Sequence, residues 1–502
     1  MKNRLSLILI LFVGISAFSQ TDIITINPEQ GNQSVTFGGD AKLTIKDWAE
    51  GNTNSVSQKL FGDMNLKVFR VPIFALQPIS DAIYDNVISV INSVKAINPD
   101  VKIFASIANG DGYGNDYHGA SKFPSSWRGC CPYNVYSLNL TTYSAYLDSF
   151  MDRMSAAGIT VDYLGPYNED PGDDSDYLKI IDQMTKLGTT KIFGLERWGL
   201  LSSVADVDDV EDRTDFIGSH FYDDTTIPEA DWDATWAALV AASEDPVWYT
   251  ESTRYKTNDG IDNLVAGMDN IFPAIRGGVE GVVFYQVCKR FVYANGSALP
   301  IKYTGFQNIV NNSEGKVINS TSNNSNIKVV VFGNESTLDV HIINKNLTDS
   351  TVDLQLLNSY LGTGTVNRKI WTANNTAQQS NYTLSDNSNW NIDIPANSYS
   401  YLKIPLNKSV LGINELSLKN NQQFKVTPNP SHNGHFQINI PKNNTAEKIT
   451  LKIFTVDGRQ VFNETRKYES KIELNNNLPS GMYLISVLAG NTVYNSKVIV
   501  SD

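Results

Sequence analysis

The sequence predicts an α/β fold, a (β/α)8 barrel with an adjoining antiparallel β-sandwich and a small C-terminal β-sandwich domain. Between residues 35 and 290, short apolar runs alternate eight times with segments of helical periodicity, as a barrel of this kind requires. After residue 301 only strand-like runs separated by Asn, Ser, Thr and Gly remain, which favours a sandwich. The length of 502 residues fits about three domains.

The predicted barrel spans residues 35–300. Its expected strands are 35–39, 68–73, 102–107, 163–167, 191–195, 216–219, 247–250 and 281–285. Apolar residues recur at helical spacing in 83–97, 143–157, 177–187, 232–242 and 264–275. A doubly wound open sheet is the alternative, but no Gly-rich dinucleotide fingerprint follows any strand. We therefore expect the barrel.

The remaining segments have separate expected roles. Residues 1–19 read as a signal peptide, because Lys2 and Arg4 precede an apolar run that ends in small residues. That run is shorter than the ~20 residues of a membrane-spanning helix, and no later run is apolar enough to span a membrane. Residues 20–34 should add a strand to the sandwich at 301–406, and a linker at 407–421 leads to a final domain at 422–502.

Composition excludes several classes of protein. Charged residues make up 19% of the chain and hydrophobic residues 41%, which argues against intrinsic disorder. The net charge of −13 repels polyanions and argues against a nucleic-acid partner. The cysteines Cys130, Cys131 and Cys288 fit no zinc spacing. They allow one disulfide from Cys288 to either neighbour, or three free thiols.

Two glutamates occupy corresponding strand ends. Glu169 follows the fourth strand within the run Asn168-Glu169-Asp170-Pro171, and Glu251 closes the seventh. Active-site residues of these barrels come from the carboxyl ends of strands. A single Glu at such a place is most often a solvated loop carboxylate. Two at the same face can flank a glycosidic bond, one as proton donor and one as nucleophile.

Other strand ends carry supporting side chains. Arg70, on the second strand, is suited to holding a nucleophilic carboxylate ionised. His220 and Tyr222, after the sixth strand, should face the barrel mouth together. Asp40, after the first strand, is placed to hydrogen-bond a sugar hydroxyl, and Trp198, after the fifth, offers a flat face for a sugar ring.

A long connection at 109–139 follows the third strand and is rich in aromatic residues. Loops of this length inside a domain are usually functional, so we expect it to form a wall of the substrate cleft. Its alternative role is a small aromatic core. Trp127 and His118 are its candidate binding residues, and Arg128, Arg197 and Arg254 are candidates to hold a uronate or sulfate ester.

At these residues the sequence resembles the retaining glycoside hydrolases of clan A, most closely glycoside hydrolase family 30. The similar features are the opening Thr36-Phe37-Gly38-Gly39-Asp40, the Asn168 to Pro171 run, the block Trp248-Tyr249-Thr250-Glu251 and the sandwich beside the barrel. The resemblance covers residues 21 to 405. Two strand ends depart from the family pattern: Ala108-Asn109-Gly110-Asp111 on strand three, and Tyr285-Gln286 where a Trp is often expected.

The resemblance implies roles for individual residues. Glu169 matches the general acid/base and Glu251 the nucleophile. Asn168 would hydrogen-bond the sugar 2-hydroxyl, while Arg70, His220 and Tyr222 would position Glu251. Tyr285 would help to shape the sugar subsites. No metal or organic cofactor is implied.

The last segment resembles the C-terminal sorting domain of the type IX secretion system. It carries Val426-Thr427-Pro428-Asn429-Pro430, Lys452 to Arg459, Leu478 to Tyr483 and the terminal Lys497-Val498-Ile499-Val500, in the expected order. A carbohydrate-binding module is the alternative, but the segment lacks an evident aromatic platform. The resemblance implies the type IX machinery as a partner and a secreted or cell-surface location.

Together these patterns predict a secreted retaining β-glycoside hydrolase, endo-acting on a plant or algal polysaccharide such as xylan, β-glucan or galactan. Glu169, with a raised pKa, would protonate the leaving oxygen while Glu251 attacks the anomeric carbon. Retention needs carboxyl groups about 5 to 5.5 Å apart, whereas a separation of roughly 8 Å implies inversion. The alternative is a noncatalytic polysaccharide-binding protein or adhesin on a barrel scaffold.

Overall fold

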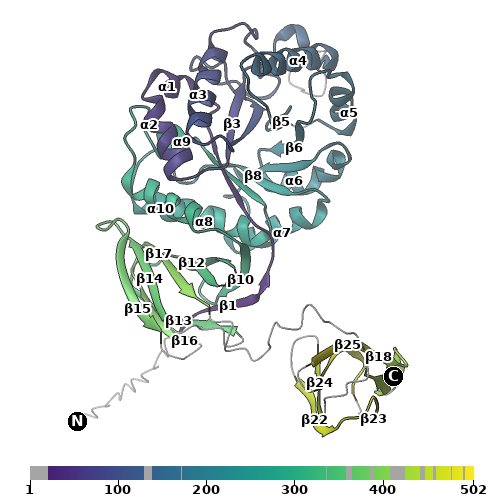
Figure 1. Cartoon of the computed structure of the whole chain (residues 1–502). Coiled ribbons are helices and arrows are strands. Elements are labelled where there is room, and N and C mark those ends of the chain that lie inside the picture. The colour runs from purple at the N-terminus through teal and green to yellow at the C-terminus, as the bar shows by residue number, and fades with distance from the viewer. Residues whose placement is uncertain are drawn as a thin grey trace, which may run out of the picture. The chain divides into compact units, whose positions relative to one another are not determined.

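A computed structural model describes residues 21–128, 138–170, 172–334, 336–357, 364–384, 389–406, 424–432, 434–440, 447–455, 460–475, 478–489 and 492–501. The chain divides into two compact units, Met1–Lys408 and Ser409–Asp502 (Figure 1). The predicted signal peptide, the predicted linker, Cys130 and Cys131 lie outside the described residues. Within these ranges, no helix combines the length and apolarity needed to cross a membrane.

Eight parallel strands of the first unit close into a TIM barrel, which confirms the predicted fold class. They are β2 (Thr36–Asp40), β3 (Val68–Ile73), β4 (Lys102–Ile107), β5 (Tyr163–Gly165), β6 (Lys191–Arg197), β7 (Phe216–His220), β8 (Val247–Ser252) and β9 (Gly281–Tyr285). Strand β9 pairs with β2 and completes the closure. All eight carboxyl ends therefore meet at one rim.

Aromatic side chains fill the barrel interior. The rings of Phe104 and Phe193 stack with centroids 4.4 Å apart, and Trp248 lies 5.2 Å from Phe193. A Cβ at Gly281 would lie 2.1 Å from Cδ2 of Trp248, so the neighbouring strand must carry a glycine there. The interior is a packed core, and the open space for a ligand lies at the mouth.

Helices surround the barrel on the outside (Figure 1). They are α1 (Ile45–Glu50), α2 (Thr53–Ser57), α3 (Ile83–Ile97), α4 (Leu140–Ala156), α5 (Asp174–Gln183), α6 (Leu200–Asp206), α7 (Trp232–Ala242), α8 (Ile261–Gly277), α9 (Val287–Arg290) and α10 (Pro300–Asn311). Short 3-10 or π turns lie at Gln58–Asp63, Gly119–Lys122, Ser125–Trp127, Val207–Asp209, Glu211–Arg213 and Glu229–Asp231. In α3, Val87, Ile91 and Val94 recur every three or four residues and are buried against the barrel core, as an amphipathic helix requires.

A nine-stranded sheet adjoins the barrel in the same unit. Its order is β15-β14-β17-β12-β11-β10-β1-β13-β16. The strands are β1 (Asp22–Gly31), β10 (Lys316–Ser322), β11 (Ile327–Gly333), β12 (Thr337–Asn344), β13 (Ser350–Leu356), β14 (Gly364–Trp371), β15 (Gln378–Leu384), β16 (Asn389–Ile394) and β17 (Ser398–Pro405). The N-terminal strand β1 pairs antiparallel with β10 and parallel with β13, and its Ile24 and Ile26 enter an aliphatic core of this sheet.

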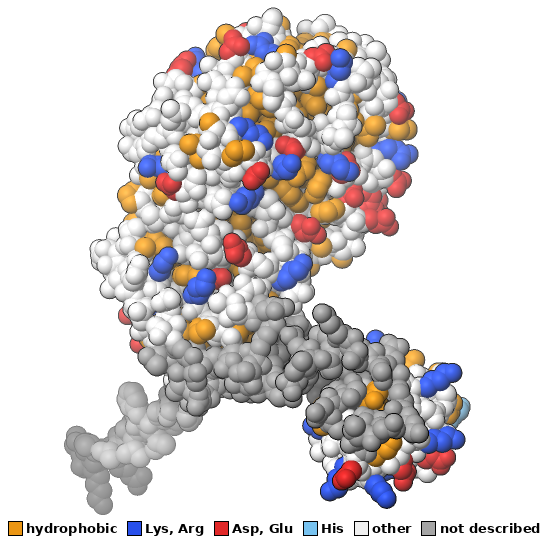
Figure 2. All heavy atoms as spheres, viewed as in Figure 1, with side chains coloured by type: hydrophobic (Ala, Val, Ile, Leu, Met, Phe, Trp, Pro, Cys, Tyr) orange, Lys and Arg blue, Asp and Glu red, His pale blue; other side chains and the backbone are white. Residues whose placement is uncertain are grey.

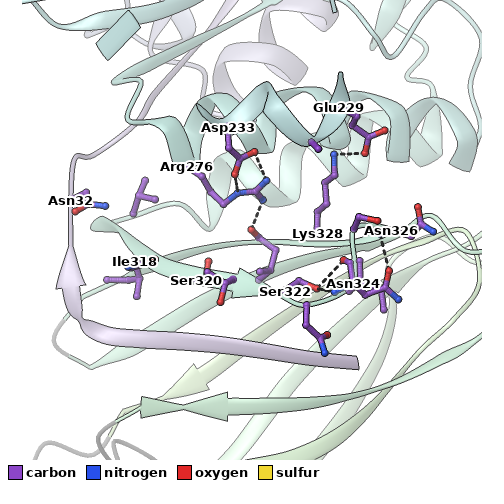
Figure 3. A pocket seen from close by; sticks show the side chains of 18 residues that line it. Asn32, Glu229, Asp233, Arg276, Ile318, Ser320, Ser322, Asn324, Asn326 and Lys328 are labelled. Carbon is purple, nitrogen blue, oxygen red and sulfur yellow. Dashed lines mark hydrogen bonds and ion pairs between the residues drawn. The ribbon is translucent and has the colours of Figure 1, made fainter. Parts of the chain in front are cut away.

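Ion pairs join the sheet to the barrel helices (Figure 3). Arg276 of α8 makes a two-point contact with Asp233 of α7 and donates to the carbonyl of Val329 on β11 at 2.8 Å. Nζ of Lys328 on β11 lies 2.7 Å from Oε1 of Glu229 and 2.5 Å from Oδ1 of Asp269. A cavity of about 780 Å³ lies between these elements. Its charged side chains are thus paired with one another.

The second unit holds two small sheets. One has the order β18-β20-β23 and the other β19-β25-β24-β21-β22. Their strands are β18 (Lys425–Thr427), β19 (Ser431–His432), β20 (His435–Asn439), β21 (Lys448–Thr455), β22 (Gln460–Lys467), β23 (Lys471–Asn475), β24 (Gly481–Ala489) and β25 (Thr492–Ser501). The sheets share one apolar core that includes Ile438, Ile453, Ile472 and Ile485. The unit is therefore stabilised by a core of its own.

Candidate active site

Glu169 and Glu251 come together at the carboxyl-terminal rim of the barrel. Glu251 lies within β8, and Glu169 follows β5 by four residues. A carboxylate oxygen of each lies within 4.8 Å of the other and of a ring nitrogen of His220, the last residue of β7. Three strands that are distant in sequence thus deliver three titratable groups to one point.

The backbone around Glu169 adopts an unusual conformation. Glu169 has a φ of 65° and Glu196 a φ of 51°, a region that non-glycine residues rarely occupy. The amide of Glu169 donates to the carbonyl of Glu196 at 2.7 Å, beside a register shift in β6 between Leu195 and Arg197. Such conformations concentrate at functional sites because the surrounding structure must hold them.

Cations surround the carboxylate of Glu251. Its Oε1 lies 2.7 Å from Nζ of Lys42 and 2.5 Å from Nη1 of Arg70, while Oε2 accepts a 3.0 Å hydrogen bond from the Tyr222 hydroxyl. Burial alone would raise the pKa of this carboxyl. The charges of His220, Lys42 and Arg70 outweigh burial and hold the pKa of Glu251 well below its usual range.

Arg70 is fully buried beneath the cavity and connects several strands. Its Nη1 also donates to Asp40 at 3.0 Å, and its Nη2 donates to Ser106 at 3.1 Å and to the carboxylate of Glu196. A Cβ at residue 165 would lie 2.2 Å from an oxygen of Glu196, so Gly165 allows that carboxylate to approach. Burial raises the pKa of Asp40 to about 6 although Arg70 and Lys42 oppose the shift.

Glu169 has fewer partners than Glu251. Its Oε2 accepts a hydrogen bond from the side-chain amide of Asn109, and its Oε1 lies 3.4 Å from Nδ1 of His220. Burial raises the pKa of Glu169, but the contact with His220 outweighs it, so the net pKa is lowered. The expected raised pKa is therefore wrong for the free protein. The sequence did not indicate that a histidine and an amide would meet this carboxylate.

The amide of Asn168 has one defined orientation. Its Oδ1 accepts from Lys42 at 2.7 Å and from Arg70 at 2.9 Å. Because both partners only donate, the oxygen must face them. The backbone carbonyl of Asn168 accepts from Lys122, which is also buried. The Asn168 amide nitrogen therefore points away from Lys42 and Arg70.

These groups border a cavity of about 270 Å³ at the barrel mouth. Its lining residues are Lys42, Leu43, Asn109, Asp116, His118, Asn168, Glu169, Trp198, Tyr222, Glu251 and Tyr285. The indole of Trp198 stacks on the ring of Tyr222 with centroids 5.7 Å apart, and 51% of Trp198 remains exposed. An exposed aromatic face beside paired carboxylates is suited to holding a sugar ring.

Glu169, His220 and Glu251 are also residue types that can ligate a metal ion. Glu169, His220 and Glu251 are the only group of at least three metal-ligating residue types found close enough together in the described part of the chain. Lys42 and Arg70 already contact Oε1 of Glu251. One of the two carboxylate oxygens of Glu251 is therefore already engaged by two cations.

Residues 425–501 match the family model of the secretion system C-terminal sorting domain. That match confirms the resemblance stated for the last segment. Curated proteins give no match to this sequence.

Solved structures share the fold of the first unit. A family 30 endoxylanase from Clostridium papyrosolvens has a TM-score of 0.59 and 16% identity, covering 76% of this chain and 100% of that one. A family 30 subfamily 8 xylanase from Clostridium acetobutylicum has the same score and identity over 76% and 99%. A bifunctional glucanase-xylanase from a metagenome library has a TM-score of 0.52 and 13% identity over 77% and 99%. At these identities the likeness shows the fold alone.

Several predicted binding residues lie elsewhere than expected. Asp40 is fully buried and contacts Arg70, so it supports the site from below the cavity and does not reach a ligand. Trp127 packs on Tyr143 and Tyr146 of α4, with centroids 6.1 and 4.9 Å away. For Trp127 the loop thus forms the small aromatic core that was the alternative prediction. Its His118 does line the cavity.

The predicted anion-binding arginines do not line this cavity. Arg197 pairs with Asp206 and Arg254 with Asp224, and neither these nor Arg128 lines the cavity in the described part of the chain. On the face seen in Figure 2, basic side chains are interspersed with acidic ones.

Cys288 is buried with a free thiol, whose pKa burial raises to about 12.

Sequence reasoning missed several site residues, among them Lys42, Asn109, Lys122 and Glu196. Lys42 lies two residues after β2, and Asn109 two after β4. The strand-end rule covers both places, but no local motif distinguishes Lys42 from a solvated surface lysine. Glu196 is the penultimate residue of β6, two residues before the predicted binding residue Trp198. Lys122 lies in the long loop, where no local signal places it beside Asn168.

Proposed function

We propose that residues 21–406 form a retaining β-glycoside hydrolase that acts on a polysaccharide outside the cell. The observation that carries the proposal is the placement of Glu169 and Glu251, whose oxygens approach within 4.8 Å at the wall of one cavity. Two carboxylates whose oxygens approach this closely favour the retaining arrangement, in which the carboxyl groups lie roughly 5 to 5.5 Å apart. The noncatalytic alternative is disfavoured because both carboxylates are present and held in place: Arg70 contacts Glu251, and His220 contacts Glu169.

In the first step, Oε2 of Glu251 attacks the anomeric carbon and the bond to the leaving oxygen breaks. Glu169 transfers its proton to that oxygen, and a glycosyl ester forms on Glu251. In the second step Glu169, now ionised, removes a proton from water as the water oxygen attacks the same carbon, and the ester bond breaks. The Asn168 amide would donate to the sugar 2-hydroxyl.

The lowered pKa of Glu169 constrains the first step. The acid must carry a proton when the leaving oxygen departs, so the free enzyme is active only where part of Glu169 is protonated. Glu251, whose pKa His220, Lys42 and Arg70 hold well below its usual range, must be ionised at the same time. Both needs are met best on the acidic side of neutrality.

The sugar is proposed to be neutral and β-linked. Xylan and β-glucan come first because the structural neighbours include xylanases and a glucanase-xylanase; galactan remains a third candidate.

Export is proposed to use a signal peptide at 1–19 followed by recognition of the C-terminal sorting domain by the type IX machinery. We also propose that a linker at 407–421 joins the sandwich at 301–406 to the sorting domain at 422–502.

The test is to incubate the protein with a panel of xylans, β-glucans and algal galactans and to identify the products. Proton NMR during the first minutes should show products of retained β configuration, and a ladder of oligosaccharides would show endo action. The Glu251→Gln variant should lose at least about 10⁴-fold in kcat, since the nucleophile is absent. Initial α products, or an active Glu251→Gln variant, would refute the mechanism.

A further inference from the structure

Lys42 is a buried cation that the two steps above do not use. Only 2% of its side chain is exposed, yet it lines the cavity. Its ammonium group lies 2.7 Å from Oε1 of Glu251 and 2.7 Å from Oδ1 of Asn168, with the carbonyl of Ile107 at 3.5 Å. Burying a lysine costs free energy unless its charge is paired, and the pairing here is with the proposed nucleophile.

The two oxygens of Glu251 have different surroundings. Oε1 contacts Lys42 and Arg70, whereas Oε2 has the neutral hydroxyl of Tyr222 as its hydrogen-bond partner. An oxygen that holds two cations is the weaker nucleophile, so Oε2 is the atom left to bond the sugar. When the ester forms on Oε2, Lys42 and Arg70 stay on the carbonyl oxygen Oε1.

Other charged or titratable groups also act on Glu251. They are Asp40 at the end of β2, Arg70 from β3, Glu169 after β5, His220 at the end of β7, Tyr222 after β7, and Tyr285 at the end of β9. Among them, Arg70 also forms ion pairs with Asp40 and Glu196. Lys42 has no carboxylate within ion-pair distance other than that of Glu251 in the described residues. Its direct ion pair is therefore with Glu251, while its charge also lowers the pKa of Asp40 and of Glu169 from a longer distance.

We propose that Lys42 is a positioning residue that speeds release of the glycosyl ester by stabilising Glu251 as a leaving carboxylate. The inference rests on the proposed function. In the release step a water oxygen bonds to the anomeric carbon, the bond from that carbon to Oε2 breaks, and its electron pair returns to the carboxylate. The water proton goes to Glu169. Negative charge then develops on Glu251, 2.7 Å from the ammonium group of Lys42.

The first step should depend on Lys42 differently. There the carboxylate of Glu251 loses its charge, so a nearby cation stabilises the reactant more than the product. Removing Lys42 makes Glu251 a stronger base and a better nucleophile, which offsets any loss of orientation. Asn168 should keep its 2.9 Å contact with Arg70 both in the wild type and in a variant without Lys42. The variant should therefore be slowed in the second step and accumulate the ester.

The test uses the full-length Lys42→Met variant with 2,4-dinitrophenyl β-xylobioside, β-cellobioside and β-galactobioside, following whichever the wild type hydrolyses fastest. We expect kcat to fall about 10- to 100-fold, as for loss of a hydrogen bond to a charged group, with a smaller change in kcat/KM. A burst of dinitrophenol and a mass increase of one glycosyl unit after acid quenching should appear. The acid limb of kcat/KM should move to higher pH, because the pKa of Glu251 rises.

Lys122→Met is the matched control. Lys122 is another buried lysine of this site, but it contacts Asn109, Asn168 and Asp170 and not Glu251. It should give no ester accumulation and no shift of the acid limb. If Lys42→Met does not fold, Lys42→Gln supplies the same comparison. Equal losses in kcat and kcat/KM without ester would overturn the role of Lys42, whereas an inert wild type would overturn the proposed function itself.

Discussion

Glu169 and Glu251 border the same cavity, but their surroundings differ in kind. Glu251 is 4% exposed and held by two cations and a tyrosine. Glu169 is 14% exposed, has an amide and a histidine beside it, and lies on backbone with a positive φ. One carboxylate is fixed in its charged form, while the other can exchange a proton with solvent or ligand. The same residue type is thus suited to two roles by its neighbours.

The largest expected effect separates these roles directly. With a dinitrophenyl glycoside, Glu169→Ala should retain a rapid first step, because this leaving group needs no proton. Added azide should restore turnover and give the β-glycosyl azide. Glu251→Ala should lose at least about 10⁴-fold, and azide should instead give the α-glycosyl azide. The same azide anomer from both variants, identified by NMR, would remove the distinction between the two residues.

A smaller effect is expected from the support beneath Glu251. Arg70→Met leaves three buried carboxylates, Asp40, Glu196 and Glu251, without their shared partner. Removing one member of a buried ion pair costs about 3 to 5 kcal/mol. Urea unfolding followed by tryptophan fluorescence measures this cost in the first unit alone, since all eight Trp residues lie within 21–406.

The matched control for Arg70 is Arg153→Met. Arg153 is a partly buried arginine of α4 that pairs with Asp85 and is remote from the cavity. Because Asp85 is mostly exposed, this pair should contribute little, about 0 to 1 kcal/mol. A free energy of unfolding that changes equally in both variants would show that the buried network does not stabilise the fold as proposed.

The smallest expected effect is a shift of pH dependence. His220 lowers the pKa of both Glu169 and Glu251. In His220→Gln both pKa values should rise, so both limbs of the kcat/KM profile should move to higher pH. The measurement is kcat/KM from pH 3 to 9 on one aryl glycoside, a profile that reports the free enzyme. An unmoved or acid-shifted profile would contradict the assigned contacts of His220.

Much of this site followed from the strand-end rule. Six predicted residues lie next to or within short β-rich runs, and the structure brings them together. They are Glu169, Glu251, Arg70, Asn168, His220 and Tyr222. Trp127 shows where composition misleads, because an aromatic residue of a long loop packs equally well on a helix or a sugar. Lys42 shows the reverse, since a charged residue with no local motif lies at the centre of the site.

The sequence by itself determined the eight strand-helix units, the all-β segments and the sorting motifs, because periodicity and turn chemistry are local properties of the chain. Tertiary structure alone decided which groups face each carboxylate. Lys42 and Glu251 are 2.7 Å apart although barrel closure joins them from opposite ends of the domain. A pKa depends on such contacts and on burial, so the lowered pKa of Glu169 could not be obtained from residue order.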